Sequence, residues 1–241
     1  MMGLRGCIFA LVLLVASPTG ANRAQLRDGC TMKGLKDCGD DYVPYAKSGR
    51  LRVPNTQFRE GCRIAKEQIV CSIQFMKNCT QGPAEAAALV VLQAWEENIE
   101  DICTVGSKSY KKYKKSMKCM ESVGNGIHKC MTRFHDHLER AVVKAAAKDV
   151  IHHSCCIYND LLDCSSKALA PCERVHAKDF VLGILDDIFG EVVHLVCGQY
   201  IKSTDACNAL PPLASLNDDD QRFSTYIELI MEAAATYGHK N

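Results

Sequence analysis

The sequence carries almost no net charge. Its 241 residues include 29 basic and 28 acidic side chains, which give a formal charge of +1 at neutral pH. A domain that binds nucleic acid through its overall field has a clear excess of lysine and arginine. The balance of charges therefore predicts no nucleic-acid partner.

Beyond its first residues, the sequence also lacks an apolar run that could cross a membrane. The most apolar stretch, residues 180–197, is interrupted by Asp186, Asp187 and Glu191. Carboxylates are costly in hydrocarbon, so we expect no transmembrane helix there. Alternation of apolar and polar residues, the mark of a half-buried strand, is absent too.

The leader is the exception to this pattern. Arg5 gives it a basic start, residues 7–16 (CIFALVLLVA) are apolar, and small residues follow at 19–21. The apolar run is too short to span a bilayer, and the order is typical of a secretory signal peptide. We expect residues 1–21 to be removed and the mature protein to be secreted and extracellular.

Short motifs of catalytic and cofactor sites are missing as well. The sequence has no His-Glu-x-x-His motif, no Gly-x-Ser-x-Gly turn and no glycine-rich phosphate loop. The histidine pairs at 135–137 and 152–153 cannot converge on one metal from a helix, because residues one or two apart point in different directions. This favours solvent-exposed histidines, and we expect no catalytic residue, no metal and no cofactor.

Cysteine, in contrast, is abundant, and its spacing occurs twice. Six cysteines are separated by 8, 24, 9, 8 and 24 positions, and six later ones by 11, 25, 9, 8 and 25. This agreement predicts a tandem duplication of a six-cysteine unit, with two additional cysteines in the second copy. The sets are Cys30, Cys38, Cys62, Cys71, Cys79 and Cys103, then Cys119, Cys130, Cys155, Cys164, Cys172 and Cys197, with Cys156 and Cys207 added.

Apolar residues at helical spacing accompany the cysteines. Loss of Cys7 with the leader leaves an even number, as full disulfide pairing requires, and secretion supplies an oxidising compartment. We predict an all-α fold of two tandem disulfide-braced units, each of three to four helices, plus a C-terminal amphipathic helix. The first unit covers 22–106, a basic linker helix 107–118, the second unit 119–210, and the C-terminal helix and tail 211–241. Helices are expected at 24–38, 56–78, 83–103, 107–122, 127–147, 148–169, 174–199 and 219–237.

The spacing also suggests which cysteines pair. Residues eight apart on a helix lie two turns apart on nearly the same face, so two such pairs on antiparallel helices would form a ladder. A third disulfide would then close the hairpin that follows. Sequence alone does not fix connectivity, and this pairing is a hypothesis. It gives Cys30–Cys79, Cys38–Cys71 and Cys62–Cys103, then Cys119–Cys172, Cys130–Cys164 and Cys155–Cys197, with Cys156–Cys207 remaining.

Two further segments are candidate sites. The sequon Asn78-Cys79-Thr80 allows a glycan on Asn78, although cross-linking of Cys79 before transfer could block it. The junction segment 107–118 (SKSYKKYKKSMK) contains no acid, so it could bind an anionic glycan or lipid surface; a solvated helix between the units is the simpler interpretation. Its lysines are Lys108, Lys111, Lys112, Lys114, Lys115 and Lys118.

The segment 155–160 (CCIYND) invites comparison with secreted phospholipases, in which a Cys-Cys pair precedes a His-Asp dyad. Here Asn159 stands where that family has its catalytic histidine. An amide cannot take a proton from water at neutral pH, so the general base is missing. We therefore expect a non-enzymatic binding protein, with a degenerate or divergent lipolytic enzyme as the alternative. Its ligand would be an apolar small molecule or lipid held between helices, or the anionic surface already named.

The adjacent cysteines 155 and 156 and the four that follow, at 164, 172, 197 and 207, carry a resemblance. They resemble those of secreted cysteine-rich helical domains of unknown function from arthropods and nematodes. The general plan is similar to that of arthropod hemolymph glycoproteins. The resemblance lies mainly in the second repeat. It implies an extracellular, disulfide-braced helical fold with a non-catalytic role.

Overall fold

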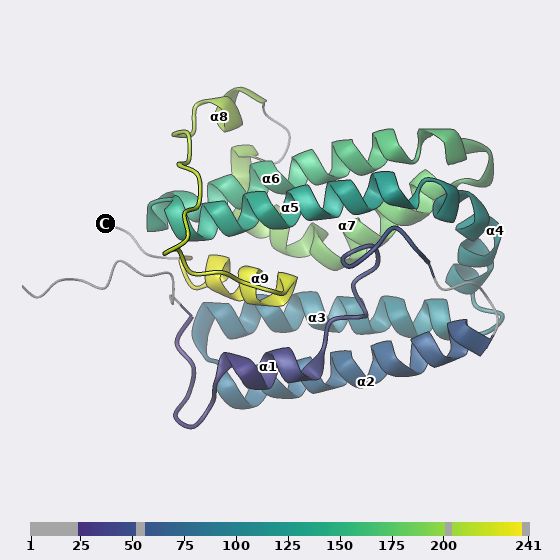
Figure 1. The fold of residues 1–241 in the computed structure, drawn as a ribbon, viewed down its shortest axis with the longest axis horizontal. Coiled ribbons are helices and arrows are strands. Elements are labelled where there is room, and N and C mark those ends of the chain that lie inside the picture. Colours follow the sequence, from purple (N-terminus) through teal and green to yellow (C-terminus); the bar gives the residue numbers. More distant parts are fainter. Residues whose placement is uncertain (1–23, 52–55, 201–203, 238–241) are drawn as a thin grey trace, which may run out of the picture.

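The computed structural model of the chain describes residues 24–51, 56–200 and 204–237. Within these residues it contains nine α-helices, two short 3₁₀ helices and no strand (Figure 1). The predicted all-α, disulfide-braced fold is confirmed. The expected signal peptide, residues 1–21, lies outside the described residues.

The long helices form two groups with two more helices between them (Figure 1). One group contains α1, α2 and α3, the other contains α5 and α6, and both α7 and α9 lie between the groups, in contact with α3. The helix α4 closes one end of the molecule. The bounds are α1 Met32–Cys38, α2 Thr56–Cys79, α3 Gly82–Cys103, α4 Lys108–Ser122, α5 Gly124–Lys144, α6 Ala147–Ala168, η1 Ala170–Val175, α7 Ala177–Val196, η2 Gly198–Tyr200, α8 Thr204–Asn208 and α9 Tyr226–Ala234.

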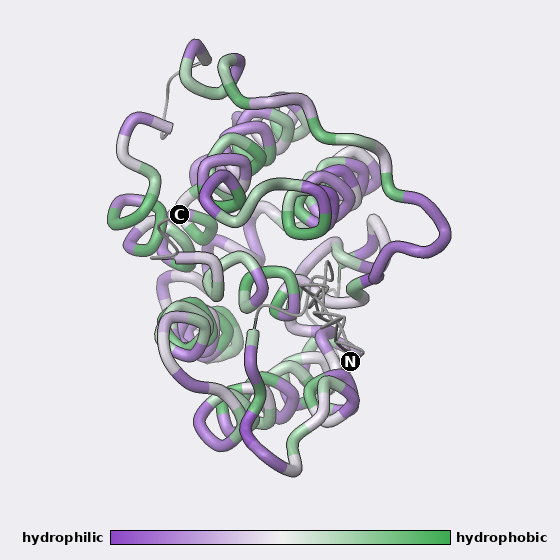
Figure 2. Tube along the Cα trace, turned by 90° about the vertical axis from the view of Figure 1, so that its left-hand side faces the viewer, coloured by the Kyte–Doolittle hydropathy of each residue, from purple (hydrophilic) through white to green (hydrophobic). Residues whose placement is uncertain are grey.

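One hydrophobic core joins the two cysteine-rich units. It includes Ile69 and Leu92 from the first unit and Val142 from the second, all fully buried. Leu229 and Met231 of α9 are equally buried in it, so the apolar face of the C-terminal helix packs on the bundle. Figure 2 looks along the helices and shows hydrophobic residues gathered on the sides that face one another.

The seven disulfides join the same cysteines that the spacing paired. The sequence separations correspond between the two units, at 49 and 53, 33 and 34, and 41 and 42 residues. Equivalent pairing is what a duplication requires, while the duplication itself stays a prediction. The bonds are Cys30–Cys79, Cys38–Cys71, Cys62–Cys103, Cys119–Cys172, Cys130–Cys164, Cys155–Cys197 and Cys156–Cys207.

Several helix boundaries differ from the sequence prediction. The first helix begins at Met32, not at residue 24, because the chain turns at Gly29, whose φ of +83° is in the left-handed region that glycine tolerates. The basic helix ends at Ser122, as its predicted range 107–122 has it, so the predicted unit boundary after residue 118 falls inside this helix. The short α8 was not predicted.

The last helix also begins later than predicted. Its predicted range begins at residue 219, but Asp220 pairs with Lys144 across 2.7 Å. The helix starts at Tyr226, where Thr225 and Glu228 form a capping box. The capping box forms two hydrogen bonds at the start of the helix, whereas the carboxylate of Asp220 already has a partner elsewhere. The helix therefore begins at the capping box.

Candidate binding pocket

A pocket of about 420 Å³ lies between the two groups of helices. Its wall is formed by the first half of α3, parts of α5 and α6, the second half of α7, and α9. Ligand pockets of proteins commonly have volumes of about 300–1,000 Å³, so this space has room for a small molecule.

Helical periodicity brings these side chains to one place. On α3 the lining residues Pro83, Ala87 and Val91 recur every four positions, so they share one face. Small side chains leave the space open: α9 contributes Ala233 and Ala234 at the points where larger apolar residues would fill it. The pocket thus exists because small residues of distant segments face each other.

The wall is apolar, and its two hydroxyl groups within the bundle already have partners. The Ser154 Oγ donates to the Val150 carbonyl at 2.8 Å, and the Tyr158 hydroxyl donates to the Leu185 carbonyl at 3.1 Å. Burial raises the pKa of the Tyr158 phenol, which keeps it neutral. The inner wall therefore offers a ligand hydrocarbon surface.

The pocket is open to solvent, and exposed residues that line it lie at the start of α3, at the end of α7 and after α9. Leu195 is 75% exposed and Tyr237 is 50% exposed, and both line the pocket. A single exposed leucine is ordinary on a protein surface. Here two exposed large side chains flank the entrance to an apolar space, so they form a hydrophobic rim.

The predicted anionic-partner segment lies at the other end of the molecule. Its helix α4 follows the end of α3, whereas the pocket includes Pro83 at the start of α3. The buried Tyr113 stacks on Phe58 with ring centroids 5.4 Å apart, which fixes the packed face of α4. The lysines of α4 that were predicted to face solvent are all exposed: Lys108, Lys111, Lys112, Lys114, Lys115 and Lys118.

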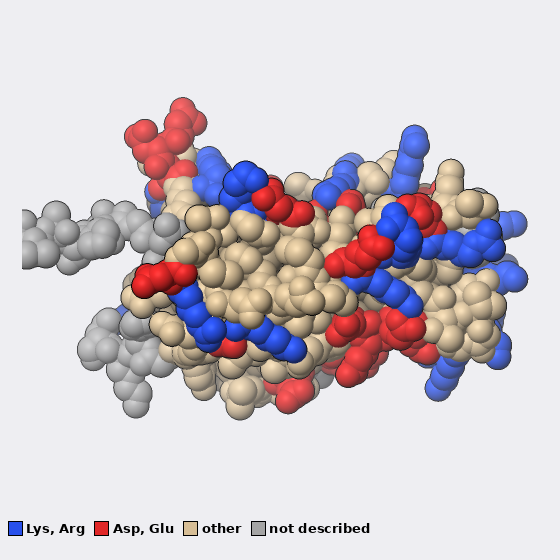
Figure 3. Space-filling model, turned by 90° about the horizontal axis from the view of Figure 1, so that it is seen from below, with Lys and Arg blue, Asp and Glu red and all other residues tan. Residues whose placement is uncertain are grey.

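These six lysines form no ion pair within the described residues. At about 100° per residue they cover nearly half of the helix circumference. The lower face of the bundle is different, because acidic and basic side chains mix there, as in the pairs of Arg63 with Glu60 and Glu67. Figure 3 shows that mixed face, with basic side chains projecting from the end where α4 lies.

The histidines differ from the prediction, because several pack against neighbouring residues. The His128 Nδ1 lies 2.7 Å from the Tyr45 carbonyl oxygen, and His152 stacks on Tyr200 with centroids 4.3 Å apart. Among the described residues no three histidine, cysteine, aspartate or glutamate side chains are grouped so as to hold a metal ion.

Asn159, which stands where secreted phospholipases carry a histidine, has a structural partner. Its Nδ2 donates to the carbonyl of Tyr200 at 2.7 Å. The amide therefore joins α6 to the 3₁₀ helix η2 that follows α7. This contact accounts for an amide at the position without reference to catalysis.

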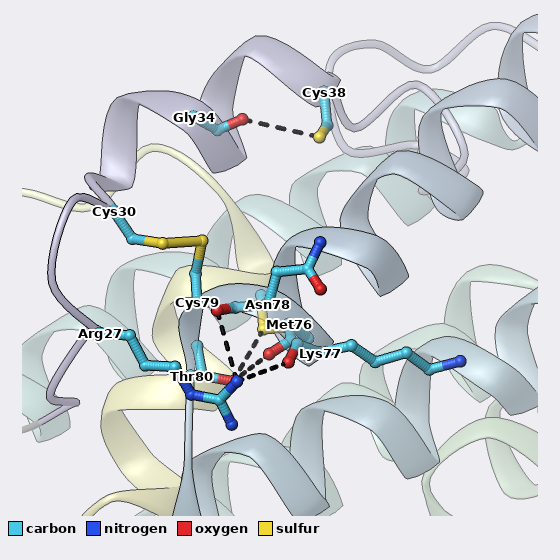
Figure 4. The surroundings of a disulfide bond; sticks show 9 residues. All are labelled: Arg27, Cys30, Gly34, Cys38, Met76, Lys77, Asn78, Cys79 and Thr80. Atoms are coloured by element: carbon cyan, nitrogen blue, oxygen red, sulfur yellow. Dashed lines mark hydrogen bonds between the residues drawn. A yellow bond between two sulfur atoms is a disulfide. The ribbon is translucent and has the colours of Figure 1, made fainter.

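The sequon residue Asn78 lies on the last turn of α2, and its side chain is exposed. The next residue, Cys79, is bonded to Cys30 (Figure 4). The Thr80 hydroxyl is buried and donates to the Met76 carbonyl at 2.7 Å. In the folded protein the threonine of the sequon is therefore buried, whereas the exposed asparagine has room for a glycan.

The sequence suggested an apolar site between helices but not its position. Its lining residues were not singled out, although one signal was present: alanine is concentrated at 84–88 and 233–235. Alanines on one face of a helix either let a neighbouring helix pack closely or leave a space beside it. Which of these occurs depends on where the neighbouring helices lie.

No helix in the described parts of the chain is both long enough and apolar enough to cross a membrane. Comparisons with protein-family models, with curated proteins and with solved structures found no match to this chain. The site must therefore be interpreted from its own geometry.

Proposed function

We propose that this protein is a secreted, non-enzymatic carrier that binds an apolar small molecule in the pocket between α3, α7 and α9. The observation that carries the proposal is the pocket itself: about 420 Å³ of space with a hydrocarbon wall and a hydrophobic rim. Bundles commonly hold ligands between their helices.

Binding of a ligand would offset the loss of stability that unfilled apolar space causes in the folded protein. Apolar space that no side chain fills deprives its lining of packing contacts, and cavities in cores destabilise proteins in proportion to their volume. A ligand that binds only the folded chain stabilises it by mass action. We therefore expect the loaded protein to unfold at a higher temperature than the empty one.

The disulfides support the extracellular part of the proposal. Seven bonds among the described residues need an oxidising compartment to form and persist. The predicted signal peptide leads the chain to such a compartment. A carrier in a body fluid or secretion would also gain resistance to unfolding from these bonds.

Displacement of an apolar fluorescent probe tests the proposal. Anilinonaphthalene sulfonate is bound to the purified, oxidised protein and then displaced by lipids of several classes. Ala87→Phe, which places a ring in the pocket, should weaken probe binding at least tenfold. Ala94→Phe on the same helix lies outside the pocket wall and should leave binding within twofold. Equal binding by both variants, or no displacement by any lipid, contradicts the proposal.

A second candidate function follows from the unpaired lysines of α4. Their exposed arc would bind a sulfated glycan, because repeated anionic groups on an extended chain match a row of cations. Retention on heparin should fall with rising salt. It should be lost when Lys111, Lys112, Lys114 and Lys115 are changed to Gln; unchanged retention would dismiss the idea.

A further inference from the structure

A second, smaller cavity lies deeper in the bundle than the pocket. Its volume is about 110 Å³, and residues of α3, α4, α5 and α7 line it, among them Trp95, Tyr113, Met131 and Ile188. Apolar cavities of similar size can hold a small hydrocarbon. This space therefore has the properties of a hydrocarbon site.

The two spaces adjoin at a pair of phenylalanines. Phe134 and Phe189 line both the outer pocket and the inner cavity, and no other described residue does. These two side chains therefore form the partition between the two spaces, and a chain that entered the inner cavity from the pocket would have to pass them.

The two rings are held differently. Phe134 is buried and stacks on Tyr226 at 5.9 Å, and the Tyr226 hydroxyl is anchored by donating to the Met131 carbonyl at 2.9 Å. Phe189 is only half-buried and meets Trp95 edge-on. Phe189 also contacts Tyr158, with ring centroids 5.6 Å apart. Side-chain rotation is a fast local motion, and Phe189 is the less buried of the two rings.

The pocket and the cavity lie in line along α3. The outer pocket includes residues of α3 from Pro83 to Val91, and the inner cavity includes Trp95 and Ile102. At a rise of 1.5 Å per residue, Pro83 and Ile102 are about 28 Å apart along the helix. A ligand that used both spaces would be long and narrow.

Two polar groups that line the inner cavity already have partners. The Trp95 Nε1 donates to the Tyr42 carbonyl at 3.1 Å, and the Tyr45 hydroxyl donates to the Met120 carbonyl at 3.3 Å. A polar group brought into this space would lose its hydration and find no partner, which is costly. The inner end of the ligand is therefore hydrocarbon.

We infer that the ligand is a single-chain amphiphile with a long unbranched tail, such as a fatty acid. The tail enters first, passes Phe134 and Phe189 and ends in the inner cavity, while the polar head stays at the rim near Leu195 and Tyr237. This inference rests on the proposed function and makes it more specific. A flexible chain can follow a narrow path that a rigid ring system cannot.

A chain-length series tests the inference on the wild-type protein. Decanoate, laurate, myristate, palmitate and stearate are compared as competitors of anilinonaphthalene sulfonate. Each buried methylene should improve affinity about fourfold, and the improvement should continue through palmitate. Affinity that levels off at decanoate overturns the inference but leaves the pocket proposal standing. No binding by any chain contradicts the proposed function itself.

A variant assigns the length dependence to the inner cavity. Ile184 lines that cavity and not the outer pocket, so Ile184→Phe should reduce palmitate affinity at least tenfold and leave decanoate affinity within twofold. Equal losses for the two ligands would contradict the path. The unaltered decanoate affinity also serves as the sign that the variant is folded.

Discussion

The disulfide between Cys155 and Cys197 joins α6 to the end of α7 and forms part of the pocket wall, with the two Cα atoms 5.7 Å apart. Both sulfur-bearing residues are buried there. The equivalent bond of the first unit, Cys62–Cys103, lies outside this pocket. Of these two equivalent disulfides, only the one in the second unit, Cys155–Cys197, lines the pocket.

Replacing Cys155 and Cys197 together by serine should weaken binding of an apolar probe at least tenfold, because the end of α7 would no longer be held against α6. Replacing Cys62 and Cys103 provides a matched control, since the two bonds close loops of nearly equal length, 42 and 41 residues. Each change should cost about 2–4 kcal/mol of unfolding free energy, measured in urea.

Equal effects of these two double variants on probe affinity would mean that the disulfide acts only through overall stability. Probe titrations are therefore carried out well below the unfolding midpoint of each variant.

The pairing of all seven disulfides is open to direct measurement. Proteolysis of the non-reduced protein followed by mass spectrometry should yield peptides linked as Cys38–Cys71 and Cys30–Cys79. Recovery of a Cys71–Cys79 peptide would contradict the antiparallel arrangement of α1 and α2. The adjacent Cys155 and Cys156 require a cleavage between them, or fragmentation of the linked peptides, before their partners can be told apart.

The capping box of α9 should contribute measurably to stability. The Glu228 carboxylate accepts from the backbone N–H of Thr225 at 2.9 Å, and the Thr225 Oγ1 accepts from the N–H of Glu228 at 3.3 Å. Thr225→Ala should lower the free energy of unfolding by about 1 kcal/mol, as loss of a cap does. Thr225→Ser keeps the hydroxyl and should restore most of it; equal losses in the two variants would contradict a capping role.

Glycosylation of Asn78 should compete with formation of the Cys30–Cys79 bond. Once that bond closes, Thr80 is buried and hydrogen-bonded, so a glycan must be added before this part of the chain folds. Changing Cys30 and Cys79 to serine should raise occupancy at Asn78 in a secreting eukaryotic cell. Amidase treatment and mass spectrometry measure it, and equal occupancy in both proteins would contradict the competition.

Local signals explain why the helices and the cysteine pairing could be predicted. Apolar residues such as Leu92 and Ile99 recur at helical spacing, and Cys71 and Cys79 lie about two turns apart on α2. Boundaries set by a single backbone angle, as at Gly29, or by a competing partner, as at Asp220, could not be found from periodicity.

The position of the pocket could not be predicted, because it depends on packing between distant segments. Val91, Val196 and Ala234 line it together although more than a hundred residues separate the first from the second. Each is an ordinary apolar residue in its own helix. Only the placement of α9 between the groups of helices leaves the space beside them unfilled.

Photolabelling with a stearate analogue that carries a diazirine on its terminal carbon tests the central claim most directly. After irradiation and proteolysis, the label should lie on residues of the inner cavity, such as Trp95, Met131 or Ile188. Excess unlabelled palmitate should abolish it. A label spread over exposed apolar residues such as Val70 and Val105, and insensitive to palmitate, would contradict a binding site inside the bundle.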